Sequence, residues 1–263
     1  MPPPPPDDSP RWRVSQYEDA ARAAGGLPAA LTGASETPAG GITVLGSTLL
    51  ADLRRVEQAG DGSEVLEVVA ACLRHRESAL IHLDDAGYVL PITVFPIQRL
   101  FHTPLQAEQW SALHWGRLRL IDVQPAVLRP PGHLYTDRVA ATQRYGSLTI
   151  LLWLLALHGP RKQLLPQIDE RAAYRLTAGP ELTALPLSGA LGPAVDHLRT
   201  EAMTLRALAR LPGMDVERAS RLLNALYLQS ALMVLRSSSG EPPARGAAAP
   251  GLIERIRSRF GGL

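Results

Sequence analysis

Several residue types are scarce in this chain of 263 residues, and each scarcity excludes a class of protein. The single cysteine, Cys72, allows no disulfide within one molecule and no zinc site built from several thiolates. The longest mostly apolar run, Leu148–Leu157, is shorter than the roughly 20 residues of a membrane-spanning helix. The N-terminus lacks the basic and then apolar pattern of a secretory signal. Together these absences predict a soluble cytoplasmic protein.

A strong excess of one charge is also missing. The chain has 27 Lys and Arg against 25 Asp and Glu, a formal net charge of +2, whereas dedicated nucleic-acid-binding proteins are usually more basic. There is no glycine-rich loop followed by Lys-Ser or Lys-Thr, no His-Glu-x-x-His pair and no Gly-x-Ser-x-Gly element. We therefore expect no enzyme activity, and no catalytic, cofactor-binding or metal-binding residues.

Composition and periodicity divide the chain into five parts, and the fold class that they predict is α+β. Residues 1–40 are expected to be a disordered proline-rich arm and linker, with one short helix near Tyr17–Ala24. Residues 41–128 are expected to form a small α+β domain with an antiparallel hairpin. Residues 132–237 are expected to form a mostly helical, winged-helix-like domain. A flexible linker at 238–250 and a basic amphipathic helix at 251–263 follow.

In the first domain, a short strand at Ile42–Leu45 precedes two predicted helices. The first helix has one apolar face, made of Leu49, Leu50, Leu53 and Val56. The second begins at the capping sequence Asp61–Glu64 and runs to about His75, with Cys72 on its buried stripe. Next, Ser78–Leu83 and Tyr88–Phe95 flank a turn and predict a β-hairpin. Pro91 and Pro96 are expected to place its second strand at an edge or a bulge.

In the second domain, Tyr135 to about Leu157 is expected to form one helix, apolar nearly all round at its end. The stretch Thr204–Arg236 predicts a short helix, a Pro212-Gly213 turn, a longer helix capped by Asp215, and a strand leading to a turn at Ser237–Gly240. The longer helix has a full core-facing stripe, made of Ala219, Leu222, Leu223 and Leu226. This order is typical of a winged-helix unit.

A helix–turn–helix often binds DNA through its second helix. The residues expected on the outer side of that helix are Glu217, Arg218, Arg221, Asn224 and Ala225. Arg218, Arg221 and Asn224 carry the chemistry to contact bases or phosphates. A solvated outer face or a protein-binding surface explains the same residues, so both interpretations stay open.

The last segment, Gly251–Leu263, is a candidate partner-binding helix. Leu252, Ile253, Ile256 and Phe260 form its apolar face, and Arg255 and Arg259 lie on its basic face. Such a helix suits the groove of a partner protein or, more weakly, an anionic membrane surface. Packing of this helix on its own protein is the alternative.

Three segments of the first domain, with the unit at Leu198–Arg236, resemble PATAN-type bacterial regulatory proteins. The segments are Arg76–Leu83, Gly87–Phe95 and Gln98–His102, which are similar to that family's two strands and read-out segment. The resemblance implies an adaptor that acts by protein–protein contact in signalling. We therefore predict a non-enzymatic regulatory protein that uses the helix at Leu148–Leu157, the hairpin edge or the C-terminal helix. The alternative is a winged-helix transcriptional regulator that binds DNA.

Overall fold

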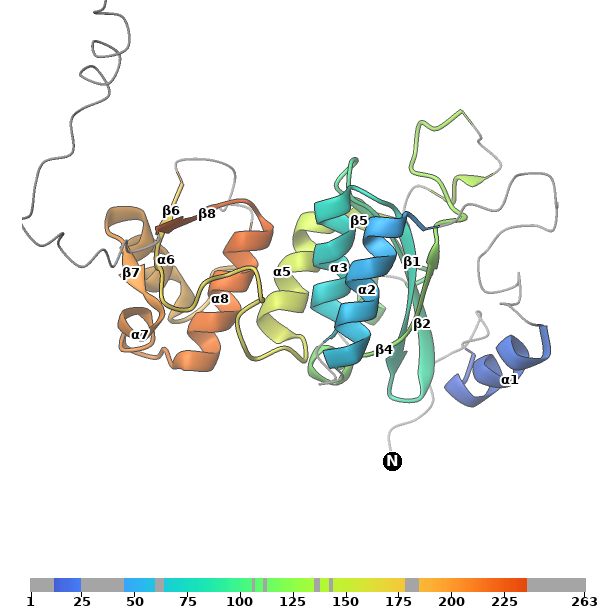
Figure 1. Ribbon diagram of the computed structural model, residues 1–263, viewed down its shortest axis with the longest axis horizontal. Coiled ribbons are helices and arrows are strands. Elements are labelled where there is room, and N and C mark those ends of the chain that lie inside the picture. The colour runs from blue at the N-terminus through green and yellow to red at the C-terminus, as the bar shows by residue number, and fades with distance from the viewer. Residues whose placement is uncertain are drawn as a thin grey trace, which may run out of the picture.

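The computed structural model describes residues 12–24, 45–59, 64–105, 107–110, 113–134, 138–141, 144–177 and 185–235. The chain has the α+β fold that its sequence predicts, with helices packed on antiparallel sheets (Figure 1). The helices are α1 (Val14–Ala24), α2 (Ser47–Ala59), α3 (Glu64–His75), α4 (Ala107–Trp110), the 3-10 helix η2 (Trp115–Arg117), α5 (Leu148–His158), α6 (Leu191–Thr200), α7 (Leu205–Leu208) and α8 (Val216–Leu228). The strands are β1 (Ala79–Asp85), β2 (Tyr88–Phe95), β3 (Leu100–His102), β4 (Arg119–Pro125), β5 (Tyr145–Ser147), β6 (Ala173–Leu176), β7 (Met203–Thr204) and β8 (Leu232–Leu235).

The first sheet has five antiparallel strands in the order β4-β1-β2-β3-β5. Its centre is the predicted hairpin of β1 and β2, in which Asp85 pairs with Tyr88 across a tight turn. Ala86 and Gly87 both have positive φ angles, as a two-residue hairpin turn requires, and the Asp84 carboxylate accepts a hydrogen bond from the Gly87 N–H.

Strand β2 as a whole is not an edge strand, because β1 and β3 flank it. At Pro91, however, the side of β2 that faces away from β1 has no partner among the described strands, as the predicted edge position requires. The local backbone explains how a proline fits there. The Val89 N–H points away from β1 and donates to the Trp12 carbonyl, and the Pro91 nitrogen points the same way two residues later. On that side β3 pairs only with Thr93–Phe95, so Pro91 removes no hydrogen bond from the ladder.

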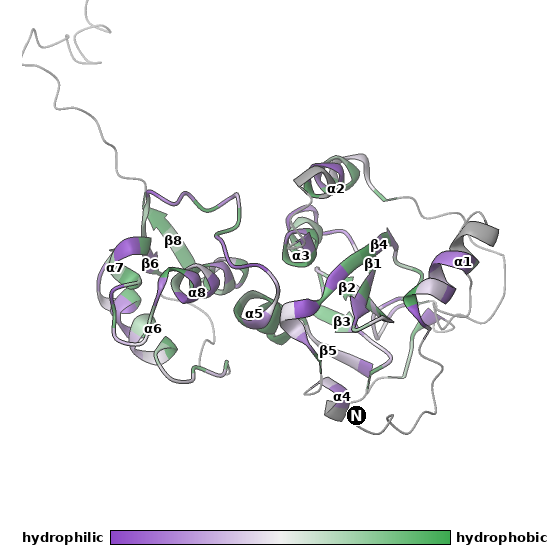
Figure 2. Cartoon of the chain, turned by 90° about the horizontal axis from the view of Figure 1, so that it is seen from below, coloured by the Kyte–Doolittle hydropathy of each residue, from purple (hydrophilic) through white to green (hydrophobic). Residues whose placement is uncertain are grey.

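The two faces of this sheet are covered differently. Ile81, Ile92 and Phe101 point into the main core, which also holds α3 and α5. The opposite side, which we call the second face, carries Leu80, His82, Thr93, His102 and Tyr145. Figure 2 shows α1 on the side of the sheet away from α3 and α5. Strand alternation therefore places apolar side chains towards the core and several polar ones on the second face.

The second sheet has the order β7-β6-β8, and α6, α7 and α8 surround it. The predicted order of two helices and a strand is present, although the first helix is reduced to the four residues of α7. The strand that pairs with β8 is β6, which precedes these helices in the chain. The turn predicted at Ser237–Gly240 lies outside the described residues, as do the predicted strand residues 42–44, the capping residues 61–63 and the linker at 238–250.

Helix α5 lies between the two sheets and contacts both α3 and α8 (Figure 1). Leu151, Leu152 and Trp153 are buried, so α5 is a core helix, as its apolar sequence predicts. The predicted helix from Tyr135 to Leu157 is nevertheless wrong in its first half. Tyr145–Ser147 is strand β5, which pairs with β3, so the first sheet continues past the boundary predicted at residues 128–132.

An ion pair connects the segment after α5 to helix α3. The Arg161 guanidinium contacts the Glu67 carboxylate of α3, and the exposed fractions of the two side chains are 7% and 14%. Arg161 also donates to the carbonyls of Gln163 and Leu164. Glu67 is thus an acidic partner for this arginine as well as a charge in the first turn of α3.

Candidate functional site

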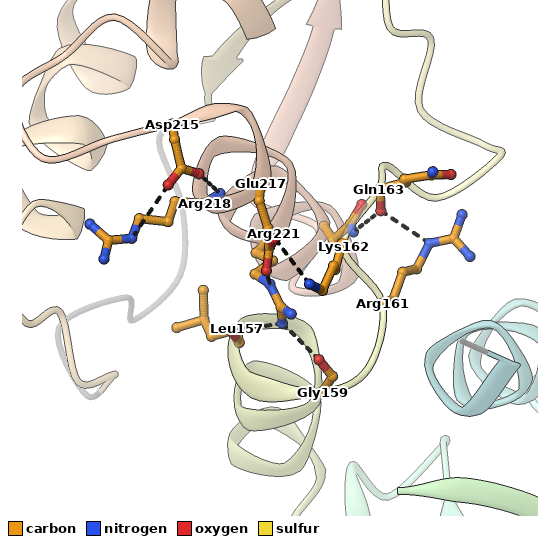
Figure 3. Close-up of polar contacts among 10 residues, drawn as sticks. Leu157, Gly159, Arg161, Lys162, Gln163, Asp215, Glu217, Arg218 and Arg221 are labelled. Carbon is orange, nitrogen blue, oxygen red and sulfur yellow. Dashed lines mark hydrogen bonds and ion pairs between the residues drawn. The ribbon is translucent and has the colours of Figure 1, made fainter. Parts of the chain in front are cut away.

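Helix α8 carries the three residues predicted as the alternative DNA-binding set. Asp215 caps the helix as predicted, because its carboxylate accepts a hydrogen bond from the Arg218 N–H at 2.7 Å. The Arg218 side chain is 62% exposed and lies 3.9 Å from the Asp215 carboxylate (Figure 3). Its guanidinium also donates to the Gly213 carbonyl. Arg218 is therefore on the surface, as expected for a contact residue.

Arg221 points inward, contrary to the prediction. Its guanidinium donates to the carbonyls of Leu157 and Gly159 at 2.9 and 2.8 Å, and its Nε donates to Glu217 (Figure 3). These carbonyls belong to the last turn and C-cap of α5, where carbonyl groups lack partners within the helix. A cation at a helix C-terminus is favourable. Arg221 thus fastens α8 to the end of α5.

Asn224 and Ala225 are fully buried, so the prediction that they face outward is also wrong. The Asn224 amide donates to the Gln163 carbonyl at 2.9 Å. The physical reason is that α8 packs on two sides, against its own unit and against α5. The structure therefore does not place Arg218, Arg221 and Asn224 on one accessible face.

The predicted partner-binding residues Leu252, Ile253, Ile256, Phe260, Arg255 and Arg259 lie outside the described residues. Two other predicted interaction sites are buried. Helix α5 is enclosed between the sheets, with Ile150 as its exposed apolar residue. The β1–β2 hairpin lies inside the first sheet, whose outermost strands are β4 and β5.

An apolar surface that the sequence analysis did not select lies on the second sheet. We define the β8 face as Ala173, Arg175, Met233 and Leu235, which point away from the core. Met233 and Leu235 are 46% and 38% exposed, and they stand opposite Arg175 and Ala173 on β6. Figure 2 shows β8 as a predominantly hydrophobic strand. Within the described part of the chain, β8 pairs on one side only, so its other edge is open.

The second face of the first sheet holds a buried polar group. The Tyr17 hydroxyl of α1 lies 3.3 Å from Nδ1 of His82, which is fully buried. Burial lowers the pKa of His82 to about 4, so this imidazole is neutral at pH 7. Burial first, and then the charge of Asp122, raise the pKa of Tyr17, and burial also raises the pKa of Asp122. This group attaches α1 to the sheet.

Other chemistry is limited in the described residues. They contain no group of three or more His, Cys, Asp or Glu side chains arranged to hold a metal ion. They also include no helix with the length and apolar character needed to cross a bilayer. Cys72 is a buried free thiol, and burial raises its pKa to about 12. The buried position of Cys72 is as predicted.

Comparison with known protein families, with curated proteins and with solved structures finds no match to this chain. In the sequence, Leu232–Leu235 is apolar throughout, so this stretch indicates a strand and shows no alternation that would reveal the β8 face. The β8 face was not predicted because its partner strand, β6, is too short to show a recognisable pattern in the sequence.

Proposed function

We propose that the protein is a non-enzymatic regulatory or adaptor protein that binds a protein partner through the β8 face. The observation that carries this proposal is the pair of exposed apolar side chains, Met233 and Leu235, on a strand whose outer edge has no partner among the described strands. An open edge presents unpaired N–H and C=O groups to a further strand. Alternate side chains on one face then supply specificity for the added strand.

The cellular location and the biological role are proposed from the sequence. A cytoplasmic location agrees with a single buried thiol, and a role in bacterial signalling rests on the resemblance to PATAN-type proteins. The basic amphipathic segment Gly251–Leu263 follows β8 in the chain and provides a second contact to the same partner. Linked contacts of this kind strengthen each other through their effective concentration.

A site-specific photocrosslinking experiment tests the proposal. A photoreactive amino acid replaces Met233 in the full chain, and Ile97, an exposed residue of the β2–β3 turn, is replaced in the control. We expect position 233 to give one defined protein adduct in extract of the native host, and Leu235→Lys to reduce it. Deletion of 251–263 should also reduce it. Equal labelling from positions 233 and 97, or no dependence on Leu235→Lys, would contradict the proposal.

The alternative, a DNA-binding regulator, now depends chiefly on Arg218. What weighs against it is that Arg221 and Asn224 are occupied by contacts to backbone carbonyls. Fluorescence anisotropy with duplex DNA over a salt series separates the two functions. Steeply salt-dependent binding that Arg218→Ala weakens would favour the DNA-binding alternative over the adaptor.

A further inference from the structure

Helix α1 is a peripheral helix that one buried side chain anchors to the first sheet (Figure 2). Among the side chains described between Trp12 and Ala20, Tyr17 is the buried one, with 3% of its surface exposed, and the others are half-buried or exposed. Tyr17 does not belong to the main core, which lies on the opposite face of the sheet. A helix held in this way can leave the sheet without disturbing that core.

The backbone just before α1 is paired with the β1–β2 hairpin. The Val14 N–H donates to the Gly87 carbonyl at 3.0 Å, and the Val89 N–H donates to the Trp12 carbonyl at 2.9 Å. These bonds lie on the side of β2 that β3 does not reach, since β3 pairs only with Thr93–Phe95. The segment therefore occupies a free edge of β2, and this edge would be uncovered if the segment left.

A chain of hydrogen bonds fixes the Tyr17 side chain to the sheet. The Tyr17 hydroxyl donates to the Asp122 carboxylate of β4, which also accepts from the Val123 N–H at 2.8 Å and from the Gln124 amide at 2.6 Å. The hydroxyl oxygen lies 3.3 Å from Nδ1 of His82. Because the hydroxyl proton is directed to Asp122, the oxygen accepts a hydrogen bond from His82 Nδ1–H. The proton of the neutral imidazole is thus on Nδ1.

This arrangement leaves no place for a second proton on His82. Its Nε2 is buried and has no hydrogen-bond partner in the described structure. Protonation of Nε2 would create a buried charge and a buried N–H group without an acceptor, and both are costly. Strand β1 is held between β2 and β4, whereas α1 lies on the outside of the sheet. We therefore expect α1, rather than β1, to move when the imidazole needs water.

We propose that residues 12–24 form a strap that opens from the first sheet as one unit, and that protonation of His82 releases it. In the open state, the free edge of β2 and the second face around His82 are accessible to solvent. The strap is separate from the β8 face and does not depend on the proposed adaptor function. It would make the exposure of this part of the sheet sensitive to acid.

The direction of the pH response follows from the two states of His82. Burial lowers its pKa to about 4 in the closed state, and a solvated imidazole has a pKa near 6.5. The open state therefore binds more protons between these values, so the closed state is fully favoured above pH 6.5 and loses stability as the pH falls towards 4.

The other titratable groups around the imidazole change this response little near neutral pH. Burial raises the pKa of Tyr17, so its hydroxyl stays protonated. Burial also raises the pKa of Asp122, the register partner of His82, and this favours the closed state at the acidic end of the range. The next charged residues on the second face and on the strap are Asp84, Arg119, Arg13, Glu18 and Asp19. The contribution of His82 is therefore measured against a variant that lacks it.

Hydrogen–deuterium exchange of the full chain at pH 7 and pH 5 tests the strap, with rates corrected for the intrinsic effect of pH on exchange. We expect the amides of residues 12–24 to exchange before those of α3 and β1 at both pH values, because the strap opens without the core. The opening equilibrium constant of the strap should increase about tenfold from pH 7 to pH 5. His82→Asn should remove most of this increase.

His102→Asn is the matched control for the histidine. The pKa of His102 is also lowered to about 4, but this residue lies against Tyr145 rather than under α1, so its replacement should leave the pH response of the strap unchanged. Exchange of the strap together with α3, as in global unfolding, would overturn the proposal. A pH response that persists in His82→Asn, or that His102→Asn removes equally, would overturn it as well.

A variant on the strap itself keeps the test decisive if His82→Asn fails to fold. Tyr17→Ala removes the anchor from α1 and leaves every residue of the sheet in place. It should increase opening of the strap at pH 7 by at least about tenfold while α3 stays protected. Glu18→Ala, at the exposed neighbouring position, should have little effect. Unchanged protection of residues 12–24 in Tyr17→Ala would contradict the assignment of Tyr17 as the anchor and overturn the proposal.

Discussion

The side-chain oxygen of Asn224 accepts a hydrogen bond from the backbone N–H of Leu165 at 2.8 Å. The amide nitrogen of the same side chain donates to the Gln163 carbonyl, so one buried residue of α8 satisfies two backbone groups of the segment after α5. This role is structural, and it occupies the very atoms with which an asparagine would contact a base.

Replacing Asn224 with leucine is expected to destabilise the protein strongly. The substitution leaves the N–H of the buried Leu165 without a partner and leaves the Gln163 carbonyl with only its hydrogen bond from Arg161. The unsatisfied N–H costs about 1–3 kcal/mol. Urea unfolding followed by circular dichroism measures the loss. Arg218→Ala, on the exposed side of the same helix, should change the unfolding free energy by less than about 0.5 kcal/mol. Equal effects of the two substitutions would refute the structural role of Asn224.

The buried ion pair between Arg161 and Glu67 yields a second prediction. Arg161→Met leaves the Glu67 carboxylate half-buried without its cation, and we expect a loss of about 3 kcal/mol in unfolding free energy. The double substitution Arg161→Met with Glu67→Leu should recover part of that loss, because no unpaired charge remains. A double-mutant cycle measures the coupling. Lys162→Met is the control, since its 68%-exposed side chain pairs with Glu217 only at the surface.

Protonation of His82 predicts a pH dependence of stability. The pKa of His82 is about 4 in the folded state, whereas an unfolded histidine has a pKa near 6.5. Below pH 6.5 the unfolded state therefore binds more protons than the folded state does. Stability is therefore complete above pH 6.5 and is lost as the pH falls towards 4. Between pH 7 and 5 the loss attributable to His82 should be about 1–2 kcal/mol. Tyr17 and Asp122 face this imidazole, and the raised pKa of Asp122 acts in the opposite direction at lower pH.

The measurement is the unfolding free energy as a function of pH for the wild type and for His82→Asn. The asparagine retains a polar group near the Tyr17 hydroxyl but has no proton to titrate, so its profile should be flatter between pH 7 and 5. His158→Asn, at an exposed histidine, is the comparison. An unchanged slope in His82→Asn would show that His82 does not determine the acid sensitivity.

A larger side chain at Gly146 of β5 is expected to clash with its surroundings. A Cβ atom at this position would lie 2.5 Å from the Phe101 ring, inside contact distance. Gly146→Ala should therefore cost about 1–3 kcal/mol, because Phe101 is buried in the core and has little room to move. Gly116→Ala is the control, since its nearest neighbour would be the His158 carbonyl at an ordinary 3.5 Å. Thermal unfolding of the two variants should separate them by several degrees; similar melting temperatures would argue against the close packing at Phe101.

Long periodic segments of the fold were predictable from the sequence. The apolar stripes of α2, α3 and α8, the Asp215 cap and the β1–β2 hairpin are all present where their patterns indicate. Periodicity identified these elements because each buries one continuous face over several turns or strand residues. Strands of three or four residues, such as β5 and β6, are too short to show a period, and β5 was hidden within an expected helix.

The orientation of Arg221 and Asn224 was not predictable for a different reason. An apolar stripe identifies one buried face of a helix, and α8 has a second buried face whose contacts are polar. Arg221 and Asn224 meet carbonyl groups of the α5 end and the segment after it, and a backbone carbonyl leaves no mark on the sequence pattern.

Strand β6, at the centre of the second sheet, has a consequence for synthesis on the ribosome. It is translated before α6, α7 and α8, yet both of its partner strands follow it in the chain. During elongation Tyr174 and Leu176, which are buried in the finished sheet, have no strand beside them until β7 and then β8 emerge. Nascent chains that stall before β8 should therefore expose these side chains to chaperones, and completion of β8 should release them.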